Sequence, residues 1–546
     1  MFSHILLAAL WSLSLMIHRT SATAGSEITT TLTNGNHYIF DTNGNAIDST
    51  SGKIDFFNGT YVWYGLSFAC GGDFCGILSY SSSDLATWTH NGWLFDPSTP
   101  EIEALCSGEL TGNCGRPHIV YDEGTQEYVL WVNALMPGYA IFTSSSPTSG
   151  YTFLEERALV GVQPEGTMAG DFTVEVVNGT GYVVYSLIDF ATTGSSIWPP
   201  FLQDFYVQEL TSDLRNTTGE AYKILPVGDL VDQEAESPDI FQRGDWFYIS
   251  ASNTCGFCTG TLLIMYRSKS IQGPWQRQII SADTCNGQTT GVLALPSPTE
   301  GGPTTYIHQA DTFSDAPPEV IGIRTGIHGH EFQKLEFNTD GSVQDIDCTA
   351  GKQTTISFAE ANAVPQEHQG RAVSATDGSG QSGNYSVVCD LPQYQLYQTW
   401  ASSKSGSLTE VGVNMAAAGP TGNLTVTVFR YGNNTDFFTP RYVWESLATV
   451  NIVPADLSDS MRVVRVLVNA TVQEGDRLGL ALVNDGVTPM CHPVLSHDNT
   501  VFNETTSTRT LFANGPGQVS LRGKLGNRPP VNVLPGKEIK WYSIVE

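Results

Sequence analysis

A phrase that recurs five times before residue 310 is the feature that most constrains how this chain can fold. Each copy has a polar turn, an aromatic residue and then alternating apolar and polar residues, and the aromatic residues are Tyr61, Tyr128, Tyr182, Trp246 and Tyr306. Alternation with a period of two predicts β-strands. The copies lie roughly 54 to 67 residues apart, about the length of a four-stranded propeller blade with long loops.

Several copies are followed by a further segment, such as "SYSSSDLATW" from residue 79, that indicates the second and third strands of the same unit. Helical periodicity is scarce, while Gly, Ser, Thr, Tyr and Val are frequent, so the chain reads as all-β. We expect residues 25–350 to form a five-bladed β-propeller. The strand pattern alone also allows a β-sandwich or a β-barrel.

The last third of the chain differs in composition and in strand pattern. Residues 351–380 are rich in Gly, Ala, Ser and Gln, so we expect a linker or a packed extended connection there. Residues 381–546 contain short alternating segments such as "GNLTVTVFRYG", which predict a β-sandwich accessory domain resembling a jelly roll. Cys389 and Cys491 are the only cysteines of this domain, and we expect them to pair.

The first 24 residues predict a secretory signal peptide, because an apolar run ends in the small residues Ala22-Thr23-Ala24. An uncleaved signal anchor is the alternative. Ten cysteines, none of them in this leader, fit a disulfide-bonded protein of an oxidising compartment. Asparagines that head N-x-S/T sequons and predict glycans are Asn58, Asn178, Asn216, Asn384, Asn423, Asn433, Asn469 and Asn503. We therefore expect a secreted, extracellular glycoprotein.

Charge and missing motifs narrow the function. The 26 basic and 55 acidic residues give a formal net charge of -29, which repels phosphate backbones and anionic lipid. We therefore expect no nucleic acid and no membrane partner, and a monomer that binds a neutral oligo- or polysaccharide. The sequence has no P-loop, HExxH or GxSxG motif, and we expect neither a metal nor another cofactor.

The candidate site begins with the stretch "QEAESPDIFQRGDWFYIS" at residues 233–250, where Glu236 precedes the strand that carries Trp246. In a propeller, the innermost strand of each blade lines a central channel, so polar residues before it can project into a funnel. Asp171, Gln288 and Asp311 occupy comparable positions in other copies. Carboxylates and an amide that converge on one axis suit glycosidic cleavage, which needs a carboxylic acid for the leaving oxygen and a second group that holds a water.

Three further residues and one cysteine-containing segment complete the sequence prediction. Glu234 is expected to be solvated. Trp198 and Phe257 are candidate platforms on which a sugar ring could stack. The "CGFC" segment at 255–258 favours disulfide structure in a loop over a redox or zinc motif, because the compartment is oxidising.

Residues 38 to 340 also resemble a known family. The segments "GILSYSSSDLATWTHNGWLF", "RPHIVYDEGTQEYVLWVN" and "ESPDIFQRGDWFYIS", in this order, resemble five-bladed glycoside hydrolases of family 43, in particular their exo-β-1,3-galactanase-like branch. The resemblance implies that Glu236 is the general acid of a Glu-x-Pro-x-x-Phe motif. It implies that Gln288 orients the attacking water where a general base is expected, and that Asp171 orients the acid and modulates its pKa.

The chain departs from this family pattern at three places. Thr50–Lys53 stand where related sequences have His-Gly-Gly-Gly, Gly115 stands where a Glu precedes Arg-Pro, and Gly170 replaces an Arg. Two function classes follow. One is a secreted inverting exo-glycosidase of plant polysaccharide side chains, with β-1,3-galactan favoured over arabinan or xylan oligomers. The other is a non-catalytic carbohydrate-binding propeller.

Overall fold

The structure is a computed structural model that describes most of the chain. The described residues are 27–34, 39–67, 74–106, 114–134, 137–189, 202–224, 230–254, 260–299, 302–312, 329–348, 353–359, 377–378, 385–391, 396–416, 422–431, 444–453, 462–486, 490–496, 509–512, 532–534 and 537–546. Within them the fold is nearly all β, with one short α-helix, α1 (Pro100–Cys106). In the part that the structure describes, no helix is long and apolar enough to span a membrane.

Five antiparallel sheets follow one another along the first part of the chain, and in each sheet the strands pair in sequence order. The first sheet has β2 (Thr50–Phe57), β3 (Thr60–Leu66), β4 (Ile77–Ser82) and β5 (Thr89–Trp93); the second has β6 (Gly115–Asp122), β7 (Glu127–Asn133), β8 (Tyr139–Ser144) and β9 (Thr152–Ala158). The third has β10 (Thr167–Val177), β11 (Thr180–Asp189), β12 (Leu202–Leu210) and β13 (Thr217–Ile224). The fourth has β14 (Ala235–Arg243), β15 (Trp246–Asn253), β16 (Leu263–Ser268) and β17 (Gln276–Ser281), and the fifth has β18 (Gln288–Leu295), β19 (Thr305–Thr312) and β20 (Gly329–Leu335).

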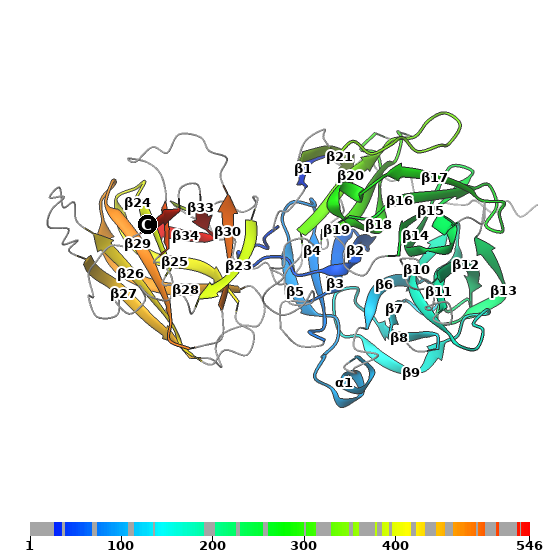
Figure 1. Cartoon of the computed structure of the whole chain (residues 1–546), viewed down its shortest axis with the longest axis horizontal. Helices are drawn as coiled ribbons and strands as arrows, with labels where there is room; N and C mark the ends of the chain where they lie inside the picture. The colour runs from blue at the N-terminus through cyan, green and yellow to red at the C-terminus, as the bar shows by residue number, and fades with distance from the viewer. Residues whose placement is uncertain are drawn as a thin grey trace, which may run out of the picture.

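The first strands of the five sheets form a closed ring. β2 contacts β6, β6 contacts β10, β10 contacts β14, β14 contacts β18, and β18 returns to β2. Figure 1 shows these strands nearest the common centre and the later strands of each sheet further out. Each pair of neighbouring sheets shares an apolar cluster, and one cluster joins Trp63 and Tyr80 of the first sheet to Leu293 and Phe332 of the fifth. Burial between sheets therefore continues around the ring without a break.

The repeated aromatic residues begin the second strand of each sheet. Tyr61, Tyr128, Trp246 and Tyr306 lie at or next to the first residue of β3, β7, β15 and β19. The repeat predicted that the strand carrying Trp246 lies innermost, and this prediction was wrong by one strand (Figure 1). Glu236 lies within the innermost strand β14 itself.

Strands from both ends of this region pair with each other. β1 (Glu27–Thr33) is antiparallel to β21 (Gln353–Ala359), and Leu32, Ile356 and Phe358 pack into the cluster between the fifth and first sheets. β21 lies inside the segment 351–380, for which the sequence predicted a linker or packed connection rather than a paired strand. The pairing ties the beginning of the described chain to the end of the ring.

The described residues after β21 form three more sheets. A six-stranded sheet has the order β27 (Trp444–Ile452), β26 (Leu424–Tyr431), β29 (Arg477–Asn484), β24 (Leu396–Ala401), β31 (Arg509–Phe512), β32 (Asn532–Leu534). A four-stranded sheet has the order β22 (Asp377–Gly378), β34 (Trp541–Val545), β25 (Gly406–Met415), β28 (Arg462–Val472), and a three-stranded sheet has the order β23 (Tyr385–Leu391), β30 (Met490–Ser496), β33 (Lys537–Ile539). The ring centres of Trp400 in the six-stranded sheet and Trp541 in the four-stranded sheet lie 4.2 Å apart, and both residues belong to one apolar core.

Disulfide bonds join Cys106 to Cys114 and Cys285 to Cys348. Cys491 is also disulfide-bonded. The side chain of Cys389 and the segment 255–258 lie outside the described residues, so the predicted pairing of Cys389 with Cys491 and the role of "CGFC" stay predictions.

Candidate active site

Every first strand of the ring carries a β-bulge close to its beginning. In four of them two residues face one residue of the second strand, and these pairs are Ser51-Gly52, Arg116-Pro117, Gly170-Asp171 and Ser237-Pro238. In β18 the pairing shifts at Thr290. A bulge bends the strand and re-aims its side chains, which is why bulges occur beside functional sites.

Only one of the five residues that precede these bulges has an ionisable side chain. The five residues are Thr50, Gly115, Ala169, Glu236 and Thr289. Glu236 is partly buried. Its Oε1 accepts a hydrogen bond from Gln288 Nε2 at 2.6 Å, and its Oε2 accepts one from Gln203 Nε2 at 2.9 Å. Among the five residues before the bulges, Glu236 is therefore the one carboxylate, and both of its oxygens accept a hydrogen bond.

Asp171 is linked to the Glu236 segment by Ser237, which directly follows Glu236 in the chain and hydrogen-bonds to Asp171. The Ser237 hydroxyl donates to Asp171 Oδ2 at 2.9 Å, and Arg116 Nε donates to the same oxygen at 3.0 Å. The guanidinium also donates to Ser237 Oγ. Arg116 and Asp171 therefore form an ion pair, and the negative charge of Asp171 is compensated where it meets Ser237, the residue that follows Glu236.

Arg116 is a site residue that the sequence analysis missed. It is buried, and it extends from β6 to Asp171 of β10, to Ser237 of β14 and, through Nη1, to the Thr289 carbonyl of β18 at 3.2 Å. One planar guanidinium thus joins four of the five first strands, a use for which the fixed fork of donors of Arg is suited. The Arg-Pro pair at the start of a strand was the available signal.

Gln288 and Asp311 face each other across β18 and β19. Gln288 Nε2 also lies 3.1 Å from Ser252 Oγ, so two contacts fix its amide. Asp311 is buried; its Oδ2 accepts the Ser51 backbone N–H at 2.6 Å, and its Oδ1 lies 3.1 Å from His330 Nδ1. These contacts assign Asp311 to holding the first sheet against the fifth, and its part in substrate binding stays a prediction.

Three other predicted residues have different outcomes. Trp198 and Phe257 lie outside the described residues. The prediction that Glu234 is solvated was wrong, because its side chain is buried beside η2 (Leu230–Gln233) and burial raises the pKa of its carboxyl. Its backbone carbonyl accepts hydrogen bonds from the N–H and the hydroxyl of Thr254.

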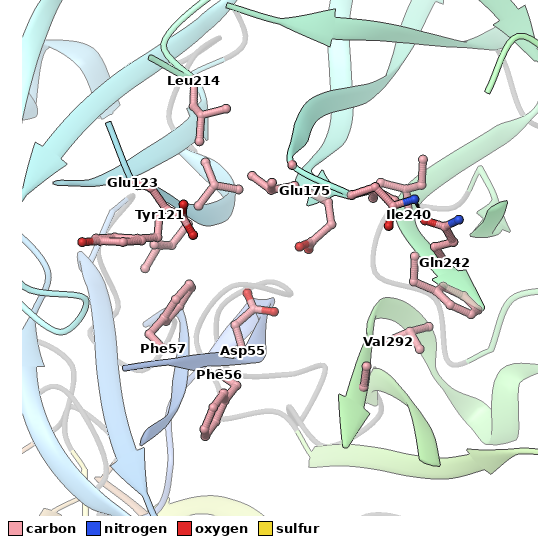
Figure 2. Close-up of a pocket in the computed structure, with 18 of the residues that line it drawn as sticks. Asp55, Phe56, Phe57, Tyr121, Glu123, Glu175, Leu214, Ile240, Gln242 and Val292 are labelled. Carbon is pink, nitrogen blue, oxygen red and sulfur yellow. Dashed lines mark hydrogen bonds between the residues drawn. The ribbon is translucent and has the colours of Figure 1, made fainter. Parts of the chain in front are cut away.

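A cavity of about 1090 Å³ opens at the other end of the ring. It is lined by the later residues of the first strands, so that Ile240 and Gln242 of β14 line it four to six residues beyond Glu236, or ~13–20 Å along the strand. Figure 2 shows the carboxylates of Asp55 and Glu175 pointing into this space. The cavity is therefore separate from the site around Glu236.

A buried lysine contacts two of the carboxylates that line this cavity. Lys53 Nζ lies 3.1 Å from Asp239 Oδ1 and 3.3 Å from both Asp55 Oδ1 and Glu175 Oε2. Burial alone would lower the pKa of Lys53, but the surrounding carboxylates outweigh it and raise that pKa well above its ordinary value. Burial also raises the pKa of Glu175 to about 7 against the opposing effect of Lys53. Three carboxylates share one ammonium here.

Among the described residues, no group of His, Cys, Asp and Glu side chains is arranged to hold a metal ion. The site around Glu236 contains carboxylate, amide, hydroxyl and guanidinium groups. Such a set can give and accept protons and hydrogen-bond to hydroxyl-rich ligands.

Neither a family model nor a curated protein matches the chain. Among solved structures, an exo-β-1,3-galactanase from Clostridium thermocellum is 23% identical, with 62% of this chain and 69% of that chain covered and a TM-score of 0.46. An exo-β-1,3-galactanase from Phanerochaete chrysosporium with β-1,3-galactotriose is 17% identical, with 84% and 99% covered and a TM-score of 0.45. A family 43 β-1,3-galactosidase is 21% identical, with 57% and 97% covered and a TM-score of 0.43.

Proposed function

We propose that residues 25–350 are a five-bladed β-propeller and that residues 381–546 are a β-sandwich accessory domain. The closed contacts among β2, β6, β10, β14 and β18 support the propeller, as do the apolar clusters shared by neighbouring sheets. The core that joins β24, β26 and β29 to β25, β28 and β34 supports the sandwich.

We propose that the propeller is a glycoside hydrolase and that Glu236 is its general acid. The observation that carries this proposal is the position of Glu236, the one ionisable residue before a bulge, with each carboxylate oxygen held by an amide. In this reaction the Glu236 carboxyl gives its proton to the glycosidic oxygen as the bond to the anomeric carbon breaks. A water then adds to that carbon, and the leaving sugar departs as an alcohol.

Gln288 and Asp171 complete the proposed mechanism. The Gln288 amide is too weak a base to take a proton, so its role is to orient the attacking water, and inversion at the anomeric carbon follows. Asp171, paired with Arg116, holds Ser237 and thereby the bulge that aims Glu236. The proton that the water loses passes to solvent.

The proposed substrate is a neutral plant polysaccharide, cleaved from its ends by a secreted enzyme that works as a monomer. A net charge of -29 disfavours anionic polymers and favours neutral ones. We favour β-1,3-galactan because of the resemblance described for the sequence, with arabinan and xylan oligomers behind it.

A non-catalytic carbohydrate-binding propeller is the second candidate, and one contact favours it. Gln288 Nε2 lies 2.6 Å from Glu236 Oε1, whereas an inverting enzyme keeps its two groups roughly 6.5–9.5 Å apart so that a water fits between them. Catalysis then requires that substrate separates this pair. A binding module has no such requirement.

Sugar release from galactan, arabinan and xylan oligosaccharides, measured for the wild type and Glu236→Gln, tests the proposal. The amide keeps the shape of the acid but has no transferable proton, so hydrolysis should fall at least ~10²-fold while oligosaccharide binding persists. Glu234→Gln is the matched control. The Glu234 carboxyl lies two residues before Glu236 in the chain, and no described hydrogen bond joins it to Gln288, Gln203 or Asp171.

Proton NMR of the first sugar released decides between inversion and retention. Should the wild type bind galactan oligosaccharides yet release no sugar from any member of the panel, the hydrolase proposal would be wrong and the binding module would stand.

A further inference from the structure

We propose that Gln203, on the third strand of the third sheet, positions the general acid Glu236. The inference rests on the proposed function and extends it to a residue with no direct part in the chemistry. Gln203 is 1% exposed, and its Nε2 lies 2.9 Å from Glu236 Oε2 and 3.0 Å from Thr254 Oγ1. It therefore contacts Glu236 from inside the protein.

The hydroxyl of Thr254 fixes which way the Gln203 amide points. Thr254 Oγ1 donates its one hydrogen to the Glu234 carbonyl at 2.5 Å, so towards Gln203 it can only accept. The group of Gln203 that faces Thr254 must then be the NH₂. One of its two N–H bonds goes to Thr254, and the other is directed at Glu236.

The backbone around Gln203 is fixed as well. Gln203 forms an isolated parallel bridge with Glu234, which joins β12 of the third sheet to the segment just before β14. Thr254 follows directly after β15, the partner of β14. The amide donor and the carboxylate acceptor are thus held by neighbouring sheets and not by a free loop.

Gly170 makes room for this arrangement. A Cβ atom at residue 170 would lie 2.3 Å from Ser186 Oγ and 3.1 Å from Gln203 Oε1. A side chain at residue 170 would therefore crowd both the Ser186 hydroxyl and the Gln203 amide. The glycine that precedes Asp171 in the third bulge is therefore part of the same arrangement as the Gln203 amide.

The chemical consequence concerns rotation of the Glu236 carboxyl. Donors on both oxygens, Gln288 on Oε1 and Gln203 on Oε2, define the plane of the group. Substrate must loosen the Gln288 contact to admit a water, and the Gln203 contact then remains to hold the plane. A proton that is not aimed at the glycosidic oxygen is transferred slowly, so losing Gln203 should slow protonation of the leaving group.

The kinetics of Gln203→Met on two substrates with different leaving groups test this role. Met has a similar size but no donor. On a β-1,3-linked galactooligosaccharide, whose leaving group needs a proton, kcat should fall by roughly 10- to 100-fold with little change in KM. On a dinitrophenyl galactoside, whose phenolate leaves without a proton, the fall should be less than about 3-fold.

Gln208→Met is the matched control. Gln208 lies on the same strand, is buried and uses its amide on the backbone of Gly161 and Gly219. It should leave the ratio of the two rates unchanged, and thermal unfolding of both variants shows whether each folds.

Gln203→Glu gives a second readout, the pH profile of activity. Glu has nearly the same size and shape as Gln, so the site can hold it. Two carboxyl groups at hydrogen-bond distance hold one proton between them to higher pH, so the alkaline limb of the pH profile should move up by about one pH unit. The limb would stay in place if the side chain of residue 203 did not face Glu236 in the folded protein.

The outcomes separate the two proposals. A wild type that hydrolyses no substrate overturns the proposed function and the role of Gln203 with it. An active wild type whose Gln203→Met variant loses both substrates equally, or neither, and whose Gln203→Glu variant keeps the original pH limb, overturns the role of Gln203 and leaves the hydrolase intact.

Discussion

At the scale of the residue, Lys53 and the carboxylates around it depend on one another. Its ammonium is buried and is shared by Asp55, Glu175 and Asp239. Asp239 is also fixed by the Thr173 hydroxyl and by the Val292 N–H, so it cannot turn away to solvent. Removing the cation would leave buried negative charges without compensation.

Lys53→Met should therefore lower the free energy of unfolding by about 3–5 kcal/mol, the range found when one partner of a buried ion pair is removed. Guanidinium denaturation measures it. Lys223→Met is the control, because Lys223 pairs with Asp204 at a partly exposed position where such a pair is worth ~0–1 kcal/mol. Equal effects of the two substitutions would contradict this account of the Lys53 cluster.

The pKa of Glu175 predicts a pH dependence of stability. Burial raises this pKa from 4.5 in the unfolded chain to about 7 in the fold. Below the unfolded-state pKa of 4.5 the Glu175 carboxyl is protonated in both states, so its contribution to the free energy of unfolding is fully present. As the pH rises through this window the unfolded chain releases the proton first, and stability is lost.

Thermal unfolding between about pH 5 and pH 8 checks this sign. The wild type should lose stability across the window more steeply than Glu175→Gln, which has no proton to release there. Parallel curves for the two proteins would mean that Glu175 titrates as an ordinary surface carboxyl.

At the scale of the element, the bulge of β2 depends on Gly52. A Cβ atom there would lie 1.8 Å from the Tyr64 carbonyl oxygen and 2.7 Å from the Gly65 Cα atom. Both obstacles are backbone atoms of the paired strand β3, so no side chain can move aside to make room. The bulge, and with it the direction of Lys53, requires a glycine.

Gly52→Ala should cost about 3 kcal/mol or more, at the upper end of the range for overpacking, because the strand itself must shift. Gly124→Ala is the comparison, since the nearest atom to its Cβ is a carboxylate oxygen of Asp122 at 3.2 Å. Denaturant midpoints of the two variants measure the difference, and a Gly52→Ala protein as stable as Gly124→Ala would show that the bulge can relax.

At the scale of the whole molecule, a turn near the N-terminus connects the ring to the C-terminal sheets. Asn414 Nδ2 donates to the Gly44 carbonyl at 2.7 Å, and Asn45 Oδ1 accepts the Val463 N–H at 2.8 Å. The Lys540 ammonium lies 3.9 Å from the centre of the Phe40 ring. Asn414 is 1% exposed, so its contact is shielded from water.

The two parts of the chain should consequently unfold together, and the variant Asn45→Ala/Asn414→Leu should separate them. Each lost buried hydrogen bond costs about 1–3 kcal/mol when a partner is left unsatisfied. Scanning calorimetry should then resolve two transitions where the wild type shows one. A single transition in both proteins would locate the coupling in other contacts.

Local sequence patterns predicted the strands and the repeated sheets of this architecture. Alternation and turns act over a few residues, so the repeats around Tyr61, Tyr128 and Trp246 indicated one sheet each. The same patterns do not say which strand of a sheet lies innermost, and that assignment was wrong by one strand. Pairing between β1 and β21 was also missed, because it joins segments more than three hundred residues apart.

The sequence by itself determined the all-β character, the repeated unit and the choice of Glu236 and Asp171 as candidate site residues, and the family resemblance singled out Gln288. Only the tertiary structure decided which side chains act on them. Arg116 contacts Asp171 across 55 residues of chain, and Gln203 contacts Glu236 across 33. Such contacts depend on how neighbouring sheets meet and on bulges that redirect side chains, and neither leaves a periodic trace in the sequence.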